Sequence, residues 1–135
     1  MEPAVLVDRY LQLCERRELA AAGALLTDDA RLVFPGAEGG TVHHDLPSVV
    51  AASAGLYRRV GKPERHYAVA TGGGPTVVTC RGTLAGEWLD GSPFSGIRFV
   101  DVFVLDGDRI AEQHVYNDLA LAAPARRPHP LESSR

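Results

Sequence analysis

The sequence is poor in the residues that mark several common protein classes. Its 135 residues include two cysteines, one tryptophan and a single lysine, Lys62. Two cysteines are too few for a disulfide-stapled scaffold, and neither Cys14 nor Cys80 lies in a CxxC or Cys/His arrangement with metal-ligand spacing. We therefore expect two free buried thiols in a reducing compartment, and no metal site. From the sequence alone the lysine carries no mechanistic weight.

Long apolar runs and an excess of positive charge are missing as well. No segment approaches the roughly 18 apolar residues that a membrane-spanning helix needs, and the first residues lack the basic and apolar regions of a secretion signal. The net charge is −3, whereas a nucleic-acid-binding protein needs a basic stripe that neutralises phosphates. We expect a cytoplasmic protein that has neither a membrane nor a nucleic acid as its partner.

The composition that remains is typical of one globular domain. Apolar residues make up 45% and charged residues 23% of the chain, near the averages for soluble globular proteins. A chain of this length has room for one hydrophobic core. We expect a single domain over residues 1–121, followed by a disordered tail over residues 122–135, where Pro and Arg recur.

Hydrophobic periodicity predicts helices first and strands afterwards. Apolar residues recur at helical spacing over Val5–Arg17, and an alanine-rich helix fits Glu18–Leu26. After a short strand at Arg31–Phe34, Asp45 is a candidate N-cap for a third helix that reaches Val60. Four strand-like runs follow, at Arg65–Ala70, Thr76–Trp88, Gly96–Leu105 and Arg109–Asp118. This order predicts an α+β fold in which three N-terminal helices pack against one curved antiparallel sheet.

The last two strand-like runs are separated by Asp106-Gly107, a strong signal for a two-residue hairpin turn. With these two residues at the centre of the turn, Asp101 lies opposite Glu112 and Phe99 lies opposite His114. The same face of the hairpin then also holds Ile97, Phe103, Leu105, Asp108, Ile110 and Tyr116. The other face is mostly small and apolar, with Val100, Val102 and Val104, and is suited to a contact between sheets or subunits.

This register predicts a pocket wall of aromatic side chains around two acids. Residues that lie directly opposite have Cβ atoms about 4.5–5.5 Å apart, so two carboxylates there repel, and burial disfavours their charges further. We therefore expect a raised pKa for Asp101 or Glu112, which gives a neutral donor beside an ionised acceptor. Two alternatives stay open. In the first, a three-residue bulged turn breaks the register and separates the two acids. In the second, Asp101, Glu112 and His114 form a solvated or internally hydrogen-bonded cluster with no catalytic role.

Three passages of the sequence carry a family resemblance. They are Val-Asp-Arg-Tyr-Leu-Gln-Leu, Ala-Leu-Leu-Thr-Asp-Asp-Ala-Arg-Leu-Val-Phe-Pro-Gly and Gly-Ile-Arg-Phe-Val-Asp-Val-Phe-Val-Leu-Asp-Gly-Asp-Arg-Ile. Over roughly residues 4–121 the chain resembles the nuclear transport factor 2-like superfamily, in its SnoaL-like branch of polyketide cyclases. The resemblance implies a cone-shaped curved sheet closed by helices around an apolar pocket, often in a dimer. The scaffold hosts isomerases, cyclases, dehydratases and binding proteins, so it specifies the reaction poorly.

The resemblance extends to the candidate site through ketosteroid isomerase, a distant relative. That enzyme forms its oxyanion hole from a first-helix tyrosine and a protonated aspartate of the sheet, which match Tyr10 and Asp101. Its general base precedes the proline that follows the first strand, where this chain has Phe34. We therefore expect Tyr10 and Asp101 to donate hydrogen bonds to an oxyanion, while His114 or Glu112 moves the proton. For Tyr10, a purely structural place in the core is the alternative.

These observations lead to a functional hypothesis. The chain is expected to be a cofactor-free enzyme that isomerises, cyclises or dehydrates a small hydrophobic carbonyl compound. A non-catalytic ligand-binding or assembly protein is the alternative. We also expect a homodimer through the valine-rich outer face of the sheet. The predicted substrate-binding residues are aromatic: Phe34, Trp88, Phe99, Phe103 and Tyr116. Of these, Trp88 and Tyr116 suit the edge of the sheet equally well.

Overall fold

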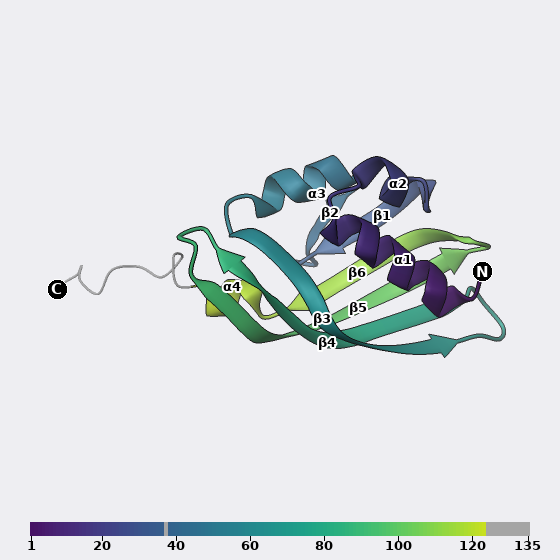
Figure 1. Cartoon of the computed structure of the whole chain (residues 1–135). Coiled ribbons are helices and arrows are strands. Elements are labelled where there is room, and N and C mark those ends of the chain that lie inside the picture. The colour runs from purple at the N-terminus through teal and green to yellow at the C-terminus, as the bar shows by residue number, and fades with distance from the viewer. Residues whose placement is uncertain (37, 124–135) are drawn as a thin grey trace.

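Helices cover one side of a curved six-stranded sheet in the computed structural model, which describes residues 1–36 and 38–123 (Figure 1). The helices are α1 (Pro3–Glu15), α2 (Leu19–Gly23), α3 (Leu46–Ser53) and α4 (Leu119–Ala122). The strands are β1 (Leu26–Phe34), β2 (Thr41–His43), β3 (Tyr57–Ala70), β4 (Val77–Trp88), β5 (Pro93–Asp106) and β6 (Arg109–Asn117). The α+β class predicted from the sequence is confirmed. Within the described residues, no helix is long and apolar enough to cross a membrane.

The strand order across the sheet is β2-β1-β6-β5-β4-β3. Four of the five neighbouring pairs are antiparallel, but β1 and β6 run parallel, with Leu32 beside Gln113. The expectation of a wholly antiparallel sheet is therefore wrong at this pair. Parallel neighbours need a long crossover, and here the chain from β2 through α3 to β5 provides it. As a result β6 lies near the middle of the sheet, under α1.

Local signals were reliable at the start of α3 and misleading at its end. Asp45 caps the helix as predicted, because its carboxylate accepts a hydrogen bond from the Ser48 backbone N–H at 2.8 Å. The helix ends at Ser53, however, and the residues from Tyr57 to Val60 begin β3. Over so short a stretch, apolar residues at helical spacing also fit a buried strand.

The second predicted helix is also shorter than expected. It ends at Gly23, and Leu26 already belongs to β1.

The hydrophobic core joins the inner side of α1 to the sheet and continues to the end of the described chain. Ala123, which was assigned to a disordered tail, is only 2% exposed, and Ala122 lies in α4. The rest of that predicted tail lies outside the described residues.

Candidate active site

The turn between β5 and β6 is displaced by one residue from its predicted place. Asp106 pairs with Arg109, so Gly107 and Asp108 form the turn. Of these two residues only Gly107 has a positive φ, at 63°. A hairpin turn with glycine at its first central position has this pattern, whereas the prediction required positive φ at Asp106 and Gly107. Displacing a turn by one residue changes the pairing but leaves every side chain on its predicted face.

A β-bulge at Ala111 then changes the faces. Leu105 pairs with Ile110, but Val104 pairs with Glu112, so Ala111 is the extra residue in β6. One extra residue turns every later side chain of the strand to the opposite side of the sheet. The two acids are therefore separated, as in the alternative with a bulged turn, but the turn keeps two residues and the bulge lies within β6.

The bulge separates Asp101 from the other predicted proton-transfer groups. Asp101 stays on the inner face and pairs with Val115. Glu112 and His114 lie on the outer face, where His114 Nε2 and Glu112 Oε1 are 2.8 Å apart. Tyr116 lies there too and is 61% exposed. The expected pairing of the two acids, and the expected places of His114 and Tyr116 on one face with Asp101, are therefore wrong; both residues line an open groove on the outer side instead.

Asp101 is a buried carboxyl group whose hydrogen bonding is incomplete. Its side chain is 1% exposed, and Oδ1 has no hydrogen-bond partner among the described residues. Oδ2 accepts a long hydrogen bond from Gln113 Nε2 at 3.5 Å and lies 3.8 Å from Lys62 Nζ. Burial raises the pKa of Asp101, while Lys62 and Gln113 oppose the rise. The predicted direction is confirmed, but the cause is desolvation and not a second carboxylate.

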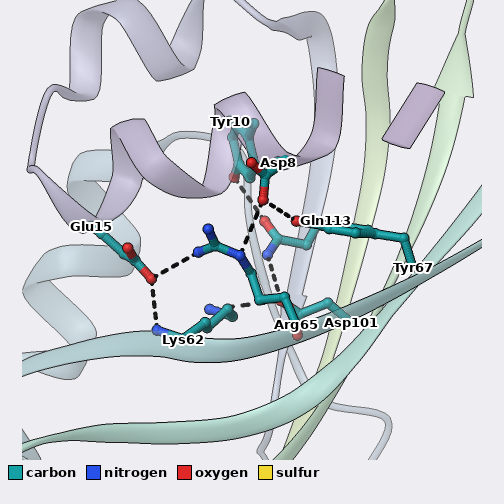
Figure 2. A network of polar contacts seen from close by, with 8 residues as sticks. All are labelled: Asp8, Tyr10, Glu15, Lys62, Arg65, Tyr67, Asp101 and Gln113. Atoms are coloured by element: carbon teal, nitrogen blue, oxygen red, sulfur yellow. Dashed lines mark hydrogen bonds and ion pairs between the residues drawn. The ribbon is translucent and has the colours of Figure 1, made fainter. Parts of the chain in front are cut away.

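Gln113 links this carboxyl group to α1 (Figure 2). The Tyr10 hydroxyl donates a hydrogen bond to Gln113 Oε1 at 2.7 Å, and both side chains are buried. Burial raises the pKa of Tyr10, so the hydroxyl remains a donor. Tyr10 therefore orients Asp101 through Gln113, whereas the sequence predicted direct donation to an oxyanion. Gln113 itself was missed, because the assumed register placed it on the outer face.

Lys62 reaches the carboxyl group from a second β-bulge. The β3–β4 ladder shifts between Gly61 and Glu64, and bulges of this kind re-aim side chains. The Lys62 side chain is 19% exposed, and its Nζ lies 5.2 Å from the centroid of the Phe99 ring, within cation–π range. The Lys62 backbone N–H donates to Glu15 Oε2 at 2.6 Å, which fastens the bulge to α1.

A set of charged contacts holds α1 against β3 beside this bulge (Figure 2). Arg65 Nε lies 3.1 Å from Asp8 Oδ1, and Arg65 Nη1 lies 3.2 Å from Glu15 Oε2. The Tyr67 hydroxyl donates to Asp8 Oδ1 at 2.6 Å. Asp8 and Glu15, which project from one side of α1, are thereby tied to β3, the strand that carries Lys62.

Lys62, Asp101, Gln113 and Tyr10 line an inner cavity of about 120 Å³. Its wall is mixed: further polar side chains, among them Glu15, Arg17, Ser53 and Asn117, line it together with apolar ones such as Leu11, Val60, Leu84 and Phe99. A cavity of about 150 Å³ accommodates one benzene molecule, so this space matches a single small ring. Polar groups that converge on a partly apolar cavity are typical of a small-molecule site.

The thiols and the metal-binding groups contribute little to this site. Cys14 and Cys80 are free, as expected, and burial raises the pKa of each thiol to about 11. Cys14 lines the cavity but stays protonated near neutral pH. In the part of the chain that the structure describes, no three His, Cys, Asp or Glu side chains gather into a metal-binding group.

Comparison with known proteins assigns the family. The sequence profile of the SnoaL-like domain matches residues 7–113. The chain belongs to the SnoaL-like family. This family lies within the nuclear transport factor 2-like superfamily and includes polyketide cyclases and isomerases. Among curated proteins, no sequence matches the chain.

Several solved structures have the same fold as this SnoaL-like domain. A protein from Xanthomonas campestris classed as a polyketide cyclase is 15% identical, with a TM-score of 0.68 over 87% of this chain and 91% of the other. A nuclear transport factor 2-like protein from Burkholderia xenovorans is 18% identical, with a TM-score of 0.66 over 91% and 92%. TerC, co-crystallised with polyporic acid, is 14% identical, with a TM-score of 0.67 over 87% and 92%. At these identities the likeness shows the fold alone.

The predicted substrate-binding aromatics take different places in the SnoaL-like domain. Phe34 and Phe99 line the inner cavity and also an open groove of about 710 Å³ on the outer side, which Tyr116 lines as well. Phe103 packs in the core against Tyr10, with ring centroids 6.0 Å apart. Trp88 is buried against Phe94, with ring centroids 4.3 Å apart, and lines neither space. Val100 is exposed on the outer face, where the homodimer contact stays a prediction.

Proposed function

We propose that this SnoaL-like protein is an enzyme that moves protons on a small hydrophobic carbonyl compound, with Asp101 as its acid–base group. The proposal is carried by one observation, the buried and unpartnered Oδ1 of a carboxyl group that lines the cavity. Leaving such an atom unsatisfied costs about 1–3 kcal/mol. A carbonyl or hydroxyl oxygen of a bound substrate supplies the missing partner.

The raised pKa of Asp101 suits this group to both directions of proton transfer. A general acid or base is most effective when its pKa lies near the working pH, and burial moves Asp101 upward toward that range. The neutral form transfers its proton to the carbonyl oxygen, which acidifies the neighbouring C–H bond and leaves Asp101 ionised. The ionised form removes that proton and later returns it. One carboxyl group thus serves isomerisation, cyclisation or dehydration, while Gln113 and Tyr10 hold it in place.

The volume of the cavity limits the part of the substrate that reaches Asp101. About 120 Å³ admits one small ring or a short chain. A longer substrate extends past Phe34 and Phe99, which line both the cavity and the outer groove. Two neighbours of the same fold, the protein classed as a polyketide cyclase and TerC with polyporic acid, support a small organic ligand.

The test uses small β,γ-unsaturated cyclic ketones, whose conversion to the conjugated isomer is followed by ultraviolet absorbance. We expect Asp101→Asn to lower kcat by about 10²–10⁴-fold, the usual contribution of general acid–base catalysis. Ligand affinity should change by less than about tenfold, because the cavity keeps its shape. Glu112→Gln is the matched control, since it removes a carboxylate of the same hairpin from the outer face. It should leave kcat within about twofold.

Two results contradict the proposal. The first is turnover that Asp101→Asn does not reduce below the level of Glu112→Gln. The second is tight binding of ketones without turnover in the natural sequence, which supports the non-catalytic ligand-binding alternative.

A further inference from the structure

We propose that Lys62 acts as a covalent catalyst, its amine forming an imine with the carbonyl carbon of the substrate. This inference rests on the proposed function and narrows its substrate class to aldehydes and ketones. Lys62 is the only lysine among 135 residues. Its ammonium nitrogen lies 3.8 Å from Oδ2 of the buried acid, and the residue lines the same cavity.

The surroundings of Lys62 are arranged to hold its amine in the cavity. The bulge in β3 interrupts the ladder at this residue, and Glu15 accepts the freed backbone N–H at 2.6 Å. The Lys62 side chain is 19% exposed, and the centroid of the Phe99 ring lies 5.2 Å from the nitrogen. The amine is therefore placed by both the backbone and an aromatic neighbour, beside the one buried carboxyl group of the described sheet.

Arginine fills every other cationic side-chain position. The chain has 14 Lys and Arg residues, and 14 minus the single Lys62 leaves 13 arginines. An arginine guanidinium always carries its proton and cannot add to a carbonyl group, whereas a lysine amine can. The composition alone does not show that Lys62 is reactive. The single lysine, however, lies beside a buried acid, where an amine that adds to a carbonyl group needs a partner for proton transfer.

Asp101 is placed to manage the protons of this reaction. An amine attacks a carbonyl carbon only after it has lost its proton. Transfer of one proton from Lys62 Nζ to Asp101 Oδ2, 3.8 Å away, turns the ion pair into a neutral amine and a neutral acid. Burial raises the pKa of Asp101 and so favours its neutral form.

The atoms balance with water as the only co-product. The Lys62 nitrogen forms a bond to the carbonyl carbon, and the C=O π pair moves to oxygen, which takes the proton from Asp101. The nitrogen returns a proton to the Asp101 carboxylate. Asp101 then protonates the hydroxyl group, which leaves as water while the nitrogen lone pair forms the C=N bond. The ammonium and the ketone have become a protonated imine and water, and Asp101 is a carboxylate again.

Asp101 removes a proton more easily from the carbon next to the protonated imine than from the carbon next to the free ketone. Its positive nitrogen withdraws electrons, so the neighbouring C–H bond is more acidic. The Asp101 carboxylate removes that proton, the C–H pair forms the C=C bond of an enamine, and the nitrogen becomes neutral. With a β,γ-unsaturated ketone the enamine is a dienamine, and Asp101 returns the proton to its γ carbon, which gives the protonated imine of the conjugated ketone. Hydrolysis of the imine returns the Lys62 amine and the product ketone.

The test traps the imine with sodium cyanoborohydride in the presence of cyclopentanone, a ketone that fits the cavity volume. Reduction leaves a stable secondary amine, and peptide mapping by mass spectrometry has only Lys62 and the Met1 α-amino group to distinguish. We expect Lys62 to be modified at least about tenfold faster than Met1, which is 72% exposed. Asp101→Asn should slow modification of Lys62 by at least about tenfold.

Two variants serve as controls. Lys62→Arg keeps the positive charge beside Asp101 but cannot form an imine. The adduct should therefore disappear, and kcat should fall about as far as it does in the Asp101→Asn variant. Arg59→Lys introduces an amine on the same strand at a position whose side chain is 68% exposed. That amine should react no faster than Met1. Circular dichroism melting establishes that each variant is folded, and trapping on the natural sequence decides the question if Lys62→Arg does not fold.

The outcomes separate this inference from the proposed function. If Asp101-dependent turnover is present but Lys62 reacts no faster than Met1, the imine is overturned and the acid–base function stands. Turnover that survives in Lys62→Arg has the same meaning. If neither turnover nor preferential trapping occurs, both proposals fall.

Discussion

On each face of the β5–β6 hairpin a carboxyl group lies beside a nitrogen base, and the base on the inner face, Lys62, comes from β3. On the inner face, Asp101 is 1% exposed and lies 3.8 Å from the Lys62 amine. On the outer face, the Glu112 side chain is 35% exposed and lies 2.8 Å from His114. The residue types are alike, but only the inner acid is removed from water, and burial raises its pKa. The environment, and not the presence of an acid and a base, makes one pair a candidate site.

One backbone irregularity decides which acid takes which environment. Ala111 is the extra residue of β6; in a regular ladder that paired Ala111 with Val104, Glu112 and His114 would point inward and Gln113 outward. The bulge therefore gives Asp101 an amide partner that is connected to α1, in place of a second carboxylate. Bulges close to active sites often have this role.

Placing a second carboxyl group beside Asp101 is the most severe way to break the comparison. Gln113→Glu adds an acid at a buried position and removes the amide that donates to Asp101, and an uncompensated buried charge costs about 3–5 kcal/mol. This is a large part of the total stability of a small domain, which is about 5–15 kcal/mol. We expect Gln113→Glu to lose cooperative urea unfolding at neutral pH as followed by circular dichroism.

The control is Tyr116→Glu, which adds the same carboxyl group to the same strand on the outer face, where the side chain is 61% exposed. A substitution at such an exposed position should leave the free energy of unfolding within about 1 kcal/mol of the natural protein. Near-natural stability of Gln113→Glu contradicts the difference assigned to the two faces.

The sequence predicted the features that depend on neighbouring residues. Helical periodicity located α1, the capping preference of Asp45 located the start of α3, and alternation placed Phe99 and Asp101 on the inner face. Each of these signals acts over a few residues. The fold class followed because the order of helices and strands leaves few ways to cover one sheet.

The parts of the site that were missed depend on contacts between distant residues. Gln113 faces inward only because of the bulge at Ala111, and no turn residue next to Ala111 indicates a bulge there. Lys62 was given no weight because its strand position, its bulge and its contact with Glu15 are set by α1 packing against β3. A periodic pattern cannot count an extra residue, so it assigns the wrong face beyond every bulge.

Adjacent residues of β5 give the next largest contrast between the two faces. Phe103 is 0% exposed and packs against Tyr10, whereas Val102 is half-buried on the outer face. Truncating a fully buried phenylalanine costs about 3–5 kcal/mol, so Phe103→Ala should lower the free energy of unfolding by this amount. Val102→Ala should cost about 1 kcal/mol or less. Equal losses in urea denaturation contradict the assignment of the core to the inner face.

The smallest effect concerns the stability cost of the buried acid. The unfolded chain ionises Asp101 near pH 3.9, and burial raises the pKa in the folded state. Below about pH 3.9 both states are protonated, and the group has no effect on stability. Each pH unit between the two pKa values lowers the free energy of unfolding by about 1.4 kcal/mol, because the unfolded state has already lost its proton. The loss is complete above the folded pKa.

Asp101→Asn removes this ionisation and keeps the shape of the side chain. Its stability relative to the natural protein should therefore rise with pH from about pH 4 and become constant once folded Asp101 is ionised. Urea denaturation over a pH series measures the difference. A difference that does not change with pH means that Asp101 has the same pKa in both states, and the contrast between the inner and outer acids then has no energetic basis.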